Sequence, residues 1–332
     1  MPLAIAVLMD PIDHIKVAKD TTLAMLLEAQ RRGHKLFYAE QADLAIRHGE
    51  AWARLSPITL RDNPADWFDL GPGTWHCLNE MDVILERKDP PVDEQFLYDT
   101  LVLELTQHGT SGRKPPLLVN APQALRDCNE KLYAMQFPQC CPPTLVAREA
   151  EELRQFVAQH GEAVLKPLDG MGGRGIFRVQ AGDTNLNSML ETLLGDAGRF
   201  VMAQKFIPAI SAGDKRILVV DGEPVPYALA RIPKAGEFRG NLASGGRGEG
   251  VPLSERDRWI VSQVAPDLKR RGLLFVGLDV IGDWLTEINV TSPTCIRELD
   301  AQFGLNIAGQ LFDAIEKRCT GACPTATPKT AT

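Results

Sequence analysis

Residues 165–173 read LKPLDGMGG, a lysine at the end of an apolar run followed at once by a glycine-rich turn. Glycines allow several backbone N–H groups to converge on one phosphate, and a nearby ammonium group neutralises its charge. Gly170 and Gly175 have the spacing of a P-loop, but Ile176 stands where that motif requires lysine. The same glycines are equally typical of an ordinary hairpin turn. This stretch therefore predicts either a phosphate-binding loop of another kind or a tight turn.

A second polar pattern lies near the other end of the chain. Glu287 and Asn289 are two residues apart in a strand-like run, which places both side chains on one face. Asp279 lies in the preceding strand-like run and would reach the same place. A small number of hard oxygen ligands suits Mg²⁺, whose coordination shell is completed by water and substrate phosphates. By itself, the Glu-x-Asn pattern is also typical of an ordinary half-exposed strand.

Cationic side chains recur at the ends of expected strands and in loops. Arginine is suited to bind carboxylates and phosphates through two hydrogen bonds, although such cations usually form a solvated surface. These residues are Arg87, Lys88, Lys131, Lys166, Lys205, Arg216, Arg231 and Arg239.

Strand-like and helix-like segments alternate in the first third of the chain, which predicts a parallel sheet covered by helices. Segment 51–75 has no clear assignment. The predicted strands are residues 5–9, 34–39, 83–85 and 117–119, and the predicted helix is 21–32. Beyond two Pro-Pro breaks, the sequence predicts helix 150–160, strands 163–168, 200–206, 216–220, 225–231, 275–281 and 284–290, and a glycine-rich loop at 233–250.

The chain has 332 residues, 44% hydrophobic and 24% charged, as in a globular protein of two or three domains. Its net charge of −7 disfavours a nucleic-acid-binding protein. No apolar run approaches the roughly 20 residues of a membrane-spanning helix, and no signal peptide is visible. Seven irregularly spaced cysteines favour reduced thiols over disulfides or zinc. These features predict a soluble cytoplasmic enzyme with neither a nucleic-acid nor a membrane partner.

Taken in order, these segments resemble those of the ATP-grasp superfamily, and most closely those of the bacterial glutathione synthetases. The resemblance covers about residues 1–317 and is carried by an ordered set of motifs. These are MDP at 9–11, MLLEAQRRG at 25–33, RKDPP at 87–91, LRDCNEK at 125–131, KPLDGMGG at 166–173, RGNLA at 239–243 and EINVTSPT at 287–294.

The resemblance implies an α/β fold with two domains. Residues 1–123 would form a Rossmann-like (pre-ATP-grasp) parallel-sheet domain, and residues 124–317 a two-lobed α+β ATP-grasp domain. Within the second domain, a glycine-loop lobe would span about 143–205, and the C-terminal lobe would carry a lid loop at 233–250. Residues 318–332, rich in Thr, Pro and Ala, are predicted to be a disordered tail.

The resemblance also implies roles for individual residues. The nucleotide would be bound by Lys131, Lys166, Gly170, Met171, Gly172, Gly173, Gln204, Lys205, Phe206, Ile207 and Asn241. A metal ion would be held by Asp279, Glu287 and Asn289. The substrate carboxylates and an acyl phosphate would be oriented by Arg216, Arg231 and Arg239.

The implied reaction joins γ-glutamylcysteine to glycine at the expense of ATP, with Mg²⁺ as the metal and Mn²⁺ as an alternative. The resemblance further implies a homo-oligomer, a tetramer. One alternative is another ATP-grasp carboxylate–amine ligase, such as one that joins two D-alanines or adds glutamate to a protein. Another is a non-catalytic ATP-binding protein of the same fold, like the synapsins.

Overall fold

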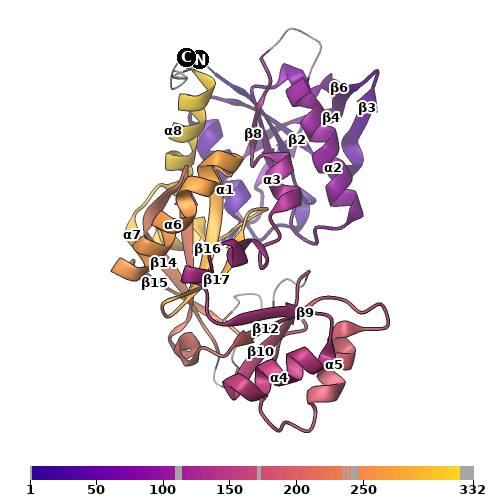
Figure 1. Cartoon of the computed structure of the whole chain (residues 1–332). Coiled ribbons are helices and arrows are strands. Elements are labelled where there is room, and N and C mark those ends of the chain that lie inside the picture. Colours follow the sequence, from indigo (N-terminus) through magenta and orange to yellow (C-terminus); the bar gives the residue numbers. More distant parts are fainter. Residues whose placement is uncertain are drawn as a thin grey trace, which may run out of the picture.

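A computed structural model describes residues 2–108, 114–169, 173–234, 236–237, 239–240 and 246–321. Within these residues, three β-sheets organise the chain, and helices cover them (Figure 1). No helix of the described part is long and apolar enough to cross a membrane.

The first sheet comes from the N-terminal third of the chain. Strand β1 (Ala4–Leu8) pairs in parallel with β2 (Lys35–Ala39) and β7 (Val83–Glu86), and β7 pairs in parallel with β8 (Leu117–Val119). The expected parallel sheet is therefore confirmed. Helix α1 (Thr21–Arg31) begins where the Asp20 carboxylate accepts a hydrogen bond from the Leu23 backbone N–H, as an N-cap does.

The unassigned stretch 51–75, together with residues 44–47 before it, completes this sheet with antiparallel strands. These are β3 (Leu44–Arg47), β4 (Glu50–Leu60), β5 (Phe68–Leu70) and β6 (Thr74–Cys77), and β4 pairs with β2, β3, β5 and β6. Along β4, buried residues such as Ala51, Ala53 and Leu55 alternate with more exposed ones, which is the period of a strand with one face on the core.

The second sheet forms the separate lower lobe of Figure 1. Its strands are β9 (Thr144–Ala147), β10 (Glu162–Pro167), β11 (Phe177–Gln180) and β12 (Val201–Lys205), in the order β11-β10-β12-β9. Helices α4 (Ala150–His160) and α5 (Leu186–Leu194) pack on one face. Ala163 and Leu165 of β10 point into that core, so Val164 and Lys166 face the opposite side.

The third sheet is antiparallel, in the order β15-β14-β13-β16-β17. Its strands are β13 (Asp214–Val220), β14 (Glu223–Ile232), β15 (Arg247–Pro252), β16 (Phe275–Ile281) and β17 (Trp284–Asn289). The helices of the remaining chain are α2 (Glu94–Glu104), α3 (Pro122–Asp127), α6 (Glu255–Arg271), α7 (Ile296–Phe303) and α8 (Ile307–Cys319).

Two expected boundaries differ from the structure. The loop predicted at 233–250 ends earlier, because residues 247–250 belong to β15 and pair with β14. Gly248 and Gly250 serve close packing: a Cβ at Gly250 would lie 2.2 Å from the Phe303 ring, and one at Gly248 3.1 Å from Leu229. Residues 318 and 319, predicted to belong to a disordered tail, are instead the last residues of α8.

The first and third sheets are joined by the side chain of Asn120, which is 2% exposed. Its Nδ2 donates to the carbonyl oxygens of Phe275 and Val290, at 2.8 and 2.7 Å. Its Oδ1 accepts from the backbone N–H groups of Leu274 and Phe275, at 2.7 and 3.0 Å. All four hydrogen-bonding positions of the amide are thus used.

Glu86, at the end of β7, is a buried carboxyl group whose two oxygens have no hydrogen-bond partner among the described residues. Burial, reinforced by the Asp99 carboxylate, raises the pKa of Glu86 from 4.5 to about 8. The unfolded chain releases this proton near pH 4.5, whereas the folded chain retains it to about pH 8. The penalty for ionising buried Glu86 is therefore absent below pH 4.5. Above that pH the free energy of unfolding falls as the pH rises towards 8, by up to roughly 1.4 kcal/mol per pH unit.

Replacing Glu86 by methionine is expected to stabilise the protein at alkaline pH, because the substitution removes this penalty. We expect a gain of roughly 2–4 kcal/mol at pH 8 and a much smaller one at pH 5. Urea unfolding of both proteins at several pH values measures the difference. Glu191→Met, at an exposed position of α5, is the control and should show no such pH dependence. A Glu86→Met gain that is equal at pH 5 and pH 8 would contradict the prediction.

Candidate active site

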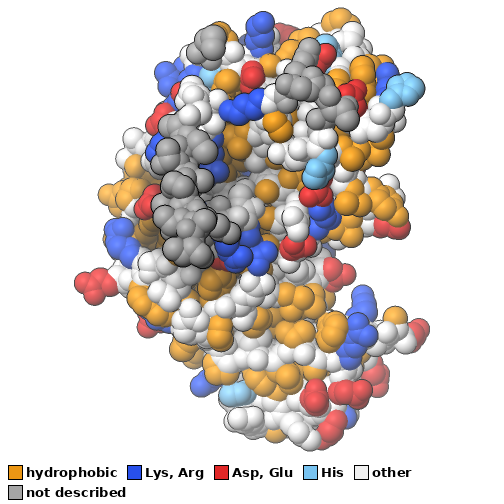
Figure 2. Space-filling view, turned by 45° about the horizontal axis from the view of Figure 1, so that its top comes forward, with side chains coloured by type: hydrophobic (Ala, Val, Ile, Leu, Met, Phe, Trp, Pro, Cys, Tyr) orange, Lys and Arg blue, Asp and Glu red, His pale blue; other side chains and the backbone are white. Residues whose placement is uncertain are grey.

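A cavity of about 350 Å³ opens between the second and third sheets and is bordered by a loop of the first. In the space-filling view the molecule is indented between its larger upper part and the lower lobe, and charged side chains lie around the indentation (Figure 2). The cavity is lined by Asp89, Glu130, Lys131, Lys166, Gly173, Gln204, Lys205, Phe206, Ile207, Asp214, Arg216, Arg231, Arg239, Asp279, Glu287, Asn289, Ser292 and Cys295, among others.

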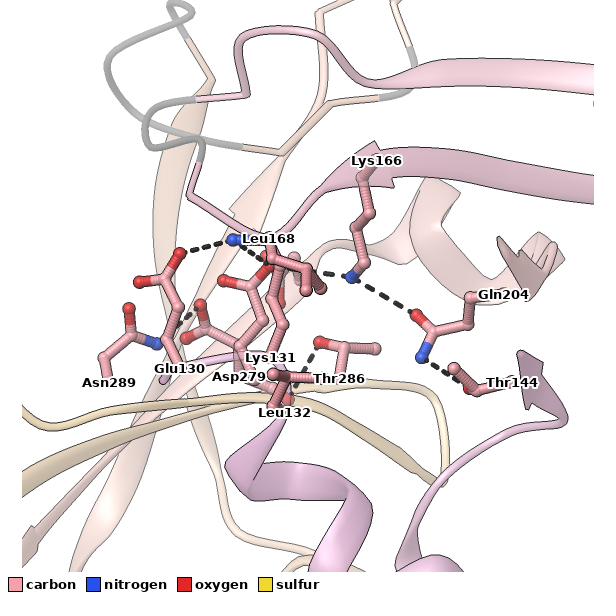
Figure 3. Close-up of polar contacts among 12 residues, drawn as sticks. Glu130, Lys131, Leu132, Thr144, Lys166, Leu168, Gln204, Asp279, Thr286 and Asn289 are labelled. Atoms are coloured by element: carbon pink, nitrogen blue, oxygen red, sulfur yellow. Dashed lines mark hydrogen bonds and ion pairs between the residues drawn. The ribbon is translucent and has the colours of Figure 1, made fainter. Parts of the chain in front are cut away.

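Two buried lysines meet one carboxylate in this cavity. Glu287 Oε1 lies 3.6 Å from both Lys131 Nζ and Lys166 Nζ. Lys131 also pairs with Glu130 (Figure 3). Burial acts to raise the pKa of Glu287, but the two ammonium groups outweigh it and hold the pKa below its ordinary value. Burial acts to lower the pKa of Lys131, but Glu287 and Glu130 raise it overall. Glu287 and Lys131 are therefore both charged at neutral pH.

Lys166 is held by residues of the second sheet. Its Nζ donates to Gln204 Oε1 at 3.4 Å, and Gln204 Nε2 donates to Thr144 Oγ1 at 3.0 Å (Figure 3). Gln204 is paired with Val164 on β10 and with Thr144 on β9. The sheet register therefore places the side chains of Val164, Gln204 and Thr144 in one row across the sheet. The segment 204–207, expected at the nucleotide base, does line the cavity.

Arginines and aspartates form a second buried cluster, at the facing ends of β13, β14 and β16. Arg216 pairs with both oxygens of Asp279, with Nη2 2.9 Å from Oδ2. Arg231 Nη2 lies 2.5 Å from Asp214 Oδ2 and 2.9 Å from Asp279 Oδ2. Burial raises the pKa of Asp279, but the two guanidinium groups reverse this and hold it well below its ordinary value. Arg231 is thus occupied by protein carboxylates on both sides.

The three expected metal ligands lie together, though not equivalently. Asp279 and Glu287 are paired across β16 and β17, and Asn289 Nδ2 donates to Asp279 Oδ2 at 3.2 Å. Both Asp279 oxygens pair with arginines, whereas the lysine contacts of Glu287 involve Oε1, so Glu287 and the carbonyl oxygen of Asn289 are better placed than Asp279 to bind a cation. No three His, Cys, Asp or Glu side chains of the described part form a metal site by themselves. The donor set fits a cation such as Mg²⁺, which takes few protein ligands and is completed by nucleotide phosphates.

Arg239 connects the expected lid to the glycine loop. Its Nη1 donates to the carbonyl oxygen of Gly173 at 3.0 Å, and its Nη2 contacts Glu237 Oε2 at 2.6 Å. The other expected loop residues, Gly170, Met171, Gly172 and Asn241, lie outside the described residues.

Sequence reasoning missed three acidic residues of this cavity, Asp89, Glu130 and Asp214. Glu130 precedes the predicted Lys131, and only the fold shows that it contacts that lysine. Asp214 lies two residues before Arg216 on one strand face, a spacing that would have indicated it. Burial raises the pKa of Asp214 to about 6, and its Oδ1 has no hydrogen-bond partner among the described residues. Asp214 therefore presents a buried acceptor at the cavity wall.

Comparison with known proteins identifies the family. The family model of the prokaryotic glutathione synthetase N-terminal domain matches residues 3–126, and that of the prokaryotic glutathione synthetase ATP-grasp domain matches residues 130–304. The glutathione synthetase of Xanthomonas campestris pv. campestris is 64% identical over 316 residues, covering 95% of this chain and 98% of that protein. The glutathione synthetase of Pseudomonas syringae pv. tomato is 59% identical over 318 residues, covering 96% and 98%.

Solved structures agree on the architecture. D-cycloserine synthetase DcsG has a TM-score of 0.64 over 95% of this chain and 99% of its own, at 16% identity, a likeness that supports the fold alone. An ATP-grasp ligase, PsnB, gives a TM-score of 0.61 over 97% of this chain and all of its own, at 19% identity. The expected α/β fold with an ATP-grasp domain is therefore confirmed. Together with the two domain matches and the high identity of the curated relatives, these findings show that the chain belongs to the prokaryotic glutathione synthetase family.

Proposed function

We propose that this cavity catalyses the ATP-dependent ligation of γ-glutamylcysteine with glycine, giving glutathione, ADP and phosphate. Family membership supports the reaction, and the buried Lys131–Glu287–Lys166 cluster is the observation that carries it. Two ammonium groups at one point of a cavity suit a polyphosphate, whose charge they would neutralise.

The chemistry requires activation of a carboxylate. Transfer of the γ-phosphoryl group of ATP to the cysteinyl carboxylate gives an acyl phosphate and ADP. The amine of glycine then attacks the acyl carbon, phosphate leaves with the C–O bond electrons, and the amine loses a proton. No covalent protein nucleophile takes part, so positioning and charge neutralisation are the work of the site.

Residue roles follow from position. Lys131 and Lys166 would contact the phosphates, with Gln204 fixing the direction of Lys166. The backbone of segment 204–207 would read the adenine, and the free oxygen of Asp214 would accept a hydrogen bond from the nucleotide.

The remaining expected ligands complete the proposal. Residues 170–173 and Asn241 would close over the nucleotide. Glu287 and Asn289 would hold Mg²⁺, with Mn²⁺ as an alternative, and the cation would offset charge on the transferring phosphoryl group.

The arginines would serve different purposes. Arg216 and Arg239 line the cavity and would orient substrate carboxylates and the acyl phosphate. Arg231, which both Asp214 and Asp279 hold, would instead keep those two carboxylates in place. A homo-oligomer, a tetramer by resemblance, and a cytoplasmic location remain predictions.

Phosphate release from ATP across a panel of dipeptides and amino acids tests the proposal. We expect release that depends strictly on γ-glutamylcysteine and glycine together, and formation of glutathione. D-Alanine in place of the dipeptide should yield nothing. Comparable turnover with D-alanine pairs would assign the cavity to another ligase. ATP binding without phosphate release from any pair would assign it to a non-catalytic protein.

A further inference from the structure

The cavity contains one acidic residue that differs from the others in its surroundings. Five Asp or Glu residues line the cavity, namely Asp89, Glu130, Asp214, Asp279 and Glu287. Glu130 and Glu287 pair with Lys131, and Asp214 and Asp279 pair with Arg231. Asp89 alone forms no direct ion pair with a Lys, Arg or His of the described part of the chain, although the buried Arg87 guanidinium interacts with it electrostatically.

Asp89 is nevertheless held firmly in place. The Ser292 hydroxyl donates to Asp89 Oδ1, and the Asp89 backbone N–H donates to Asp10 Oδ2 at 2.8 Å. Asp10 also forms an ion pair with Lys88, whose Nζ lies 2.9 Å from Asp10 Oδ1. Asp89 therefore presents a fixed and exposed carboxylate to the cavity, with Oδ2 available.

A series of contacts leads from the phosphate-binding cluster to Asp89. Glu287 is paired across the sheet with Asp279, and Asp279 is paired with Arg216. A Cβ at Gly277 would meet both Arg216 and Pro293, at 2.8 and 2.9 Å, so these two side chains lie on either side of this glycine. Ser292 immediately precedes Pro293 in the chain, and its hydroxyl group contacts Asp89. Asp89 thus lies at the N-terminal domain's side of the cavity, and the lysines of the cluster pair with Glu130 and Glu287 instead.

The border that carries Asp89 is fixed to the third sheet. Arg87, which is 5% exposed, donates to the carbonyl oxygens of Thr291 and Pro293, at 3.3 and 3.1 Å. Arg87 and Asp89 thus both bind the segment 291–293, which holds the loop bearing Asp89 against the segment bearing Ser292. A group placed this way is able to define the far end of a substrate.

The proposed substrate has a complementary charge. γ-Glutamylcysteine carries its reactive carboxylate at the cysteinyl end and an α-ammonium group at the γ-glutamyl end. The reactive end must lie near the lysines, so the ammonium group lies at the far end of the cavity. A buried or partly buried cation is stabilised by an unpaired carboxylate, and charge-assisted hydrogen bonds are among the stronger ones.

We propose that Asp89 binds the α-ammonium group of the γ-glutamyl residue and thereby selects peptides with a free amino group at that position. The proposal rests on the proposed function. Asp89 acts on substrate recognition rather than on phosphoryl transfer, because the lysines of the cluster pair with other carboxylates.

A des-amino substrate tests this directly. Glutarylcysteine has the same chain and the same carboxylates as γ-glutamylcysteine but lacks the ammonium group. The wild-type enzyme is expected to prefer γ-glutamylcysteine by roughly 10- to 100-fold in kcat/KM, the range of a charge-assisted hydrogen bond. Asp89→Asn keeps the size of the side chain and an acceptor for Ser292 but removes the charge. In this variant the preference should fall close to one, through a higher KM for γ-glutamylcysteine, with the KM values for ATP and glycine unchanged.

Controls separate the outcomes. Asp196→Asn, at an exposed position outside the cavity, should retain the wild-type preference. Unchanged KM for ATP and an unchanged unfolding temperature would show that Asp89→Asn is folded. If Asp89→Asn keeps the full preference for γ-glutamylcysteine, the proposal is wrong. A raised KM for glycine with the dipeptide preference intact would also overturn it and assign Asp89 to glycine. Absence of γ-glutamylcysteine turnover in the wild-type enzyme would instead refute the proposed function.

Discussion

Glu287→Gln is expected to lower the rate of ligation by at least about 10²-fold, a few kcal/mol of lost transition-state stabilisation. The substitution keeps the size of the side chain but removes the charge that both Lys131 and Lys166 face at 3.6 Å. It also removes the charged member of the proposed metal pair. Initial rates of glutathione formation at a series of Mg²⁺ concentrations measure the effect. Raising Mg²⁺ should recover part of the loss if metal affinity is the cause.

The structure adds an effect on stability to this prediction. From the sequence alone, Glu287→Gln would change only metal binding, and thermal stability would stay nearly constant. In the fold, the variant leaves two buried ammonium groups without their shared carboxylate, so the unfolding temperature without nucleotide should fall. ATP should raise it more in the variant than in the wild type, because phosphates supply the missing negative charge. Glu191→Gln is the exposed control. Near-normal activity of Glu287→Gln at limiting Mg²⁺ would refute the metal role.

Arg216→Met is expected to destabilise the protein by about 3–5 kcal/mol and to abolish measurable ligation. Removal of this guanidinium leaves two buried carboxylates, Asp279 and Asp214, to share Arg231. In the wild type the arginines hold the pKa of Asp279 below its ordinary value, so this stabilisation is present above that value and lost as the pH falls. The deficit of the variant should therefore be largest near neutral pH and shrink as acid protonates the unpaired carboxylate.

Urea unfolding at pH 7.5 and pH 5 measures this deficit. Arg247→Met provides the matched control, because Arg247 pairs with Glu249 at 2.8 Å on the surface, where its side chain is 76% exposed. An exposed pair contributes at most about 1 kcal/mol, so this control should be almost as stable as the wild type. Equal losses in the two variants would show that the Arg216 cluster does not stabilise the fold.

The parts of the fold that could be predicted are those with continuous apolar runs. The parallel strands β1, β2, β7 and β8 are buried on both faces, which gives such runs. Strand β4 was missed because Ala51, Trp52 and Ala53 follow one another without alternating with polar residues, and Pro57 interrupts the pattern. Strand β15 was missed because Gly248 and Gly250 suggested a loop, although their lack of a side chain makes room for Leu229 and Phe303.

The candidate site was predictable where one strand carries several of its residues. Strand periodicity alone placed Glu287 and Asn289 on one face, and the structure brings Asp279 beside them. Contacts between strands that are distant in the sequence were not predictable. Arg231 was expected to bind substrate, but its carboxylate partners come from β13 and β16. The contribution of Asp89 likewise depends on how the first domain borders the third sheet.

The four hydrogen bonds of Asn120 bear on which part of the molecule is able to move. They replace a stretch of strand pairing between the first and third sheets, and a common apolar core continues across the same boundary. A rotation at this boundary would break all four bonds at once, so the N-terminal domain and the third sheet act as one stationary frame. The lobe of residues 144–205 has its own separate core. We therefore expect this lobe, rather than the N-terminal domain, to move when a nucleotide enters and leaves, while the side of the cavity formed by the N-terminal domain and the third sheet keeps its shape.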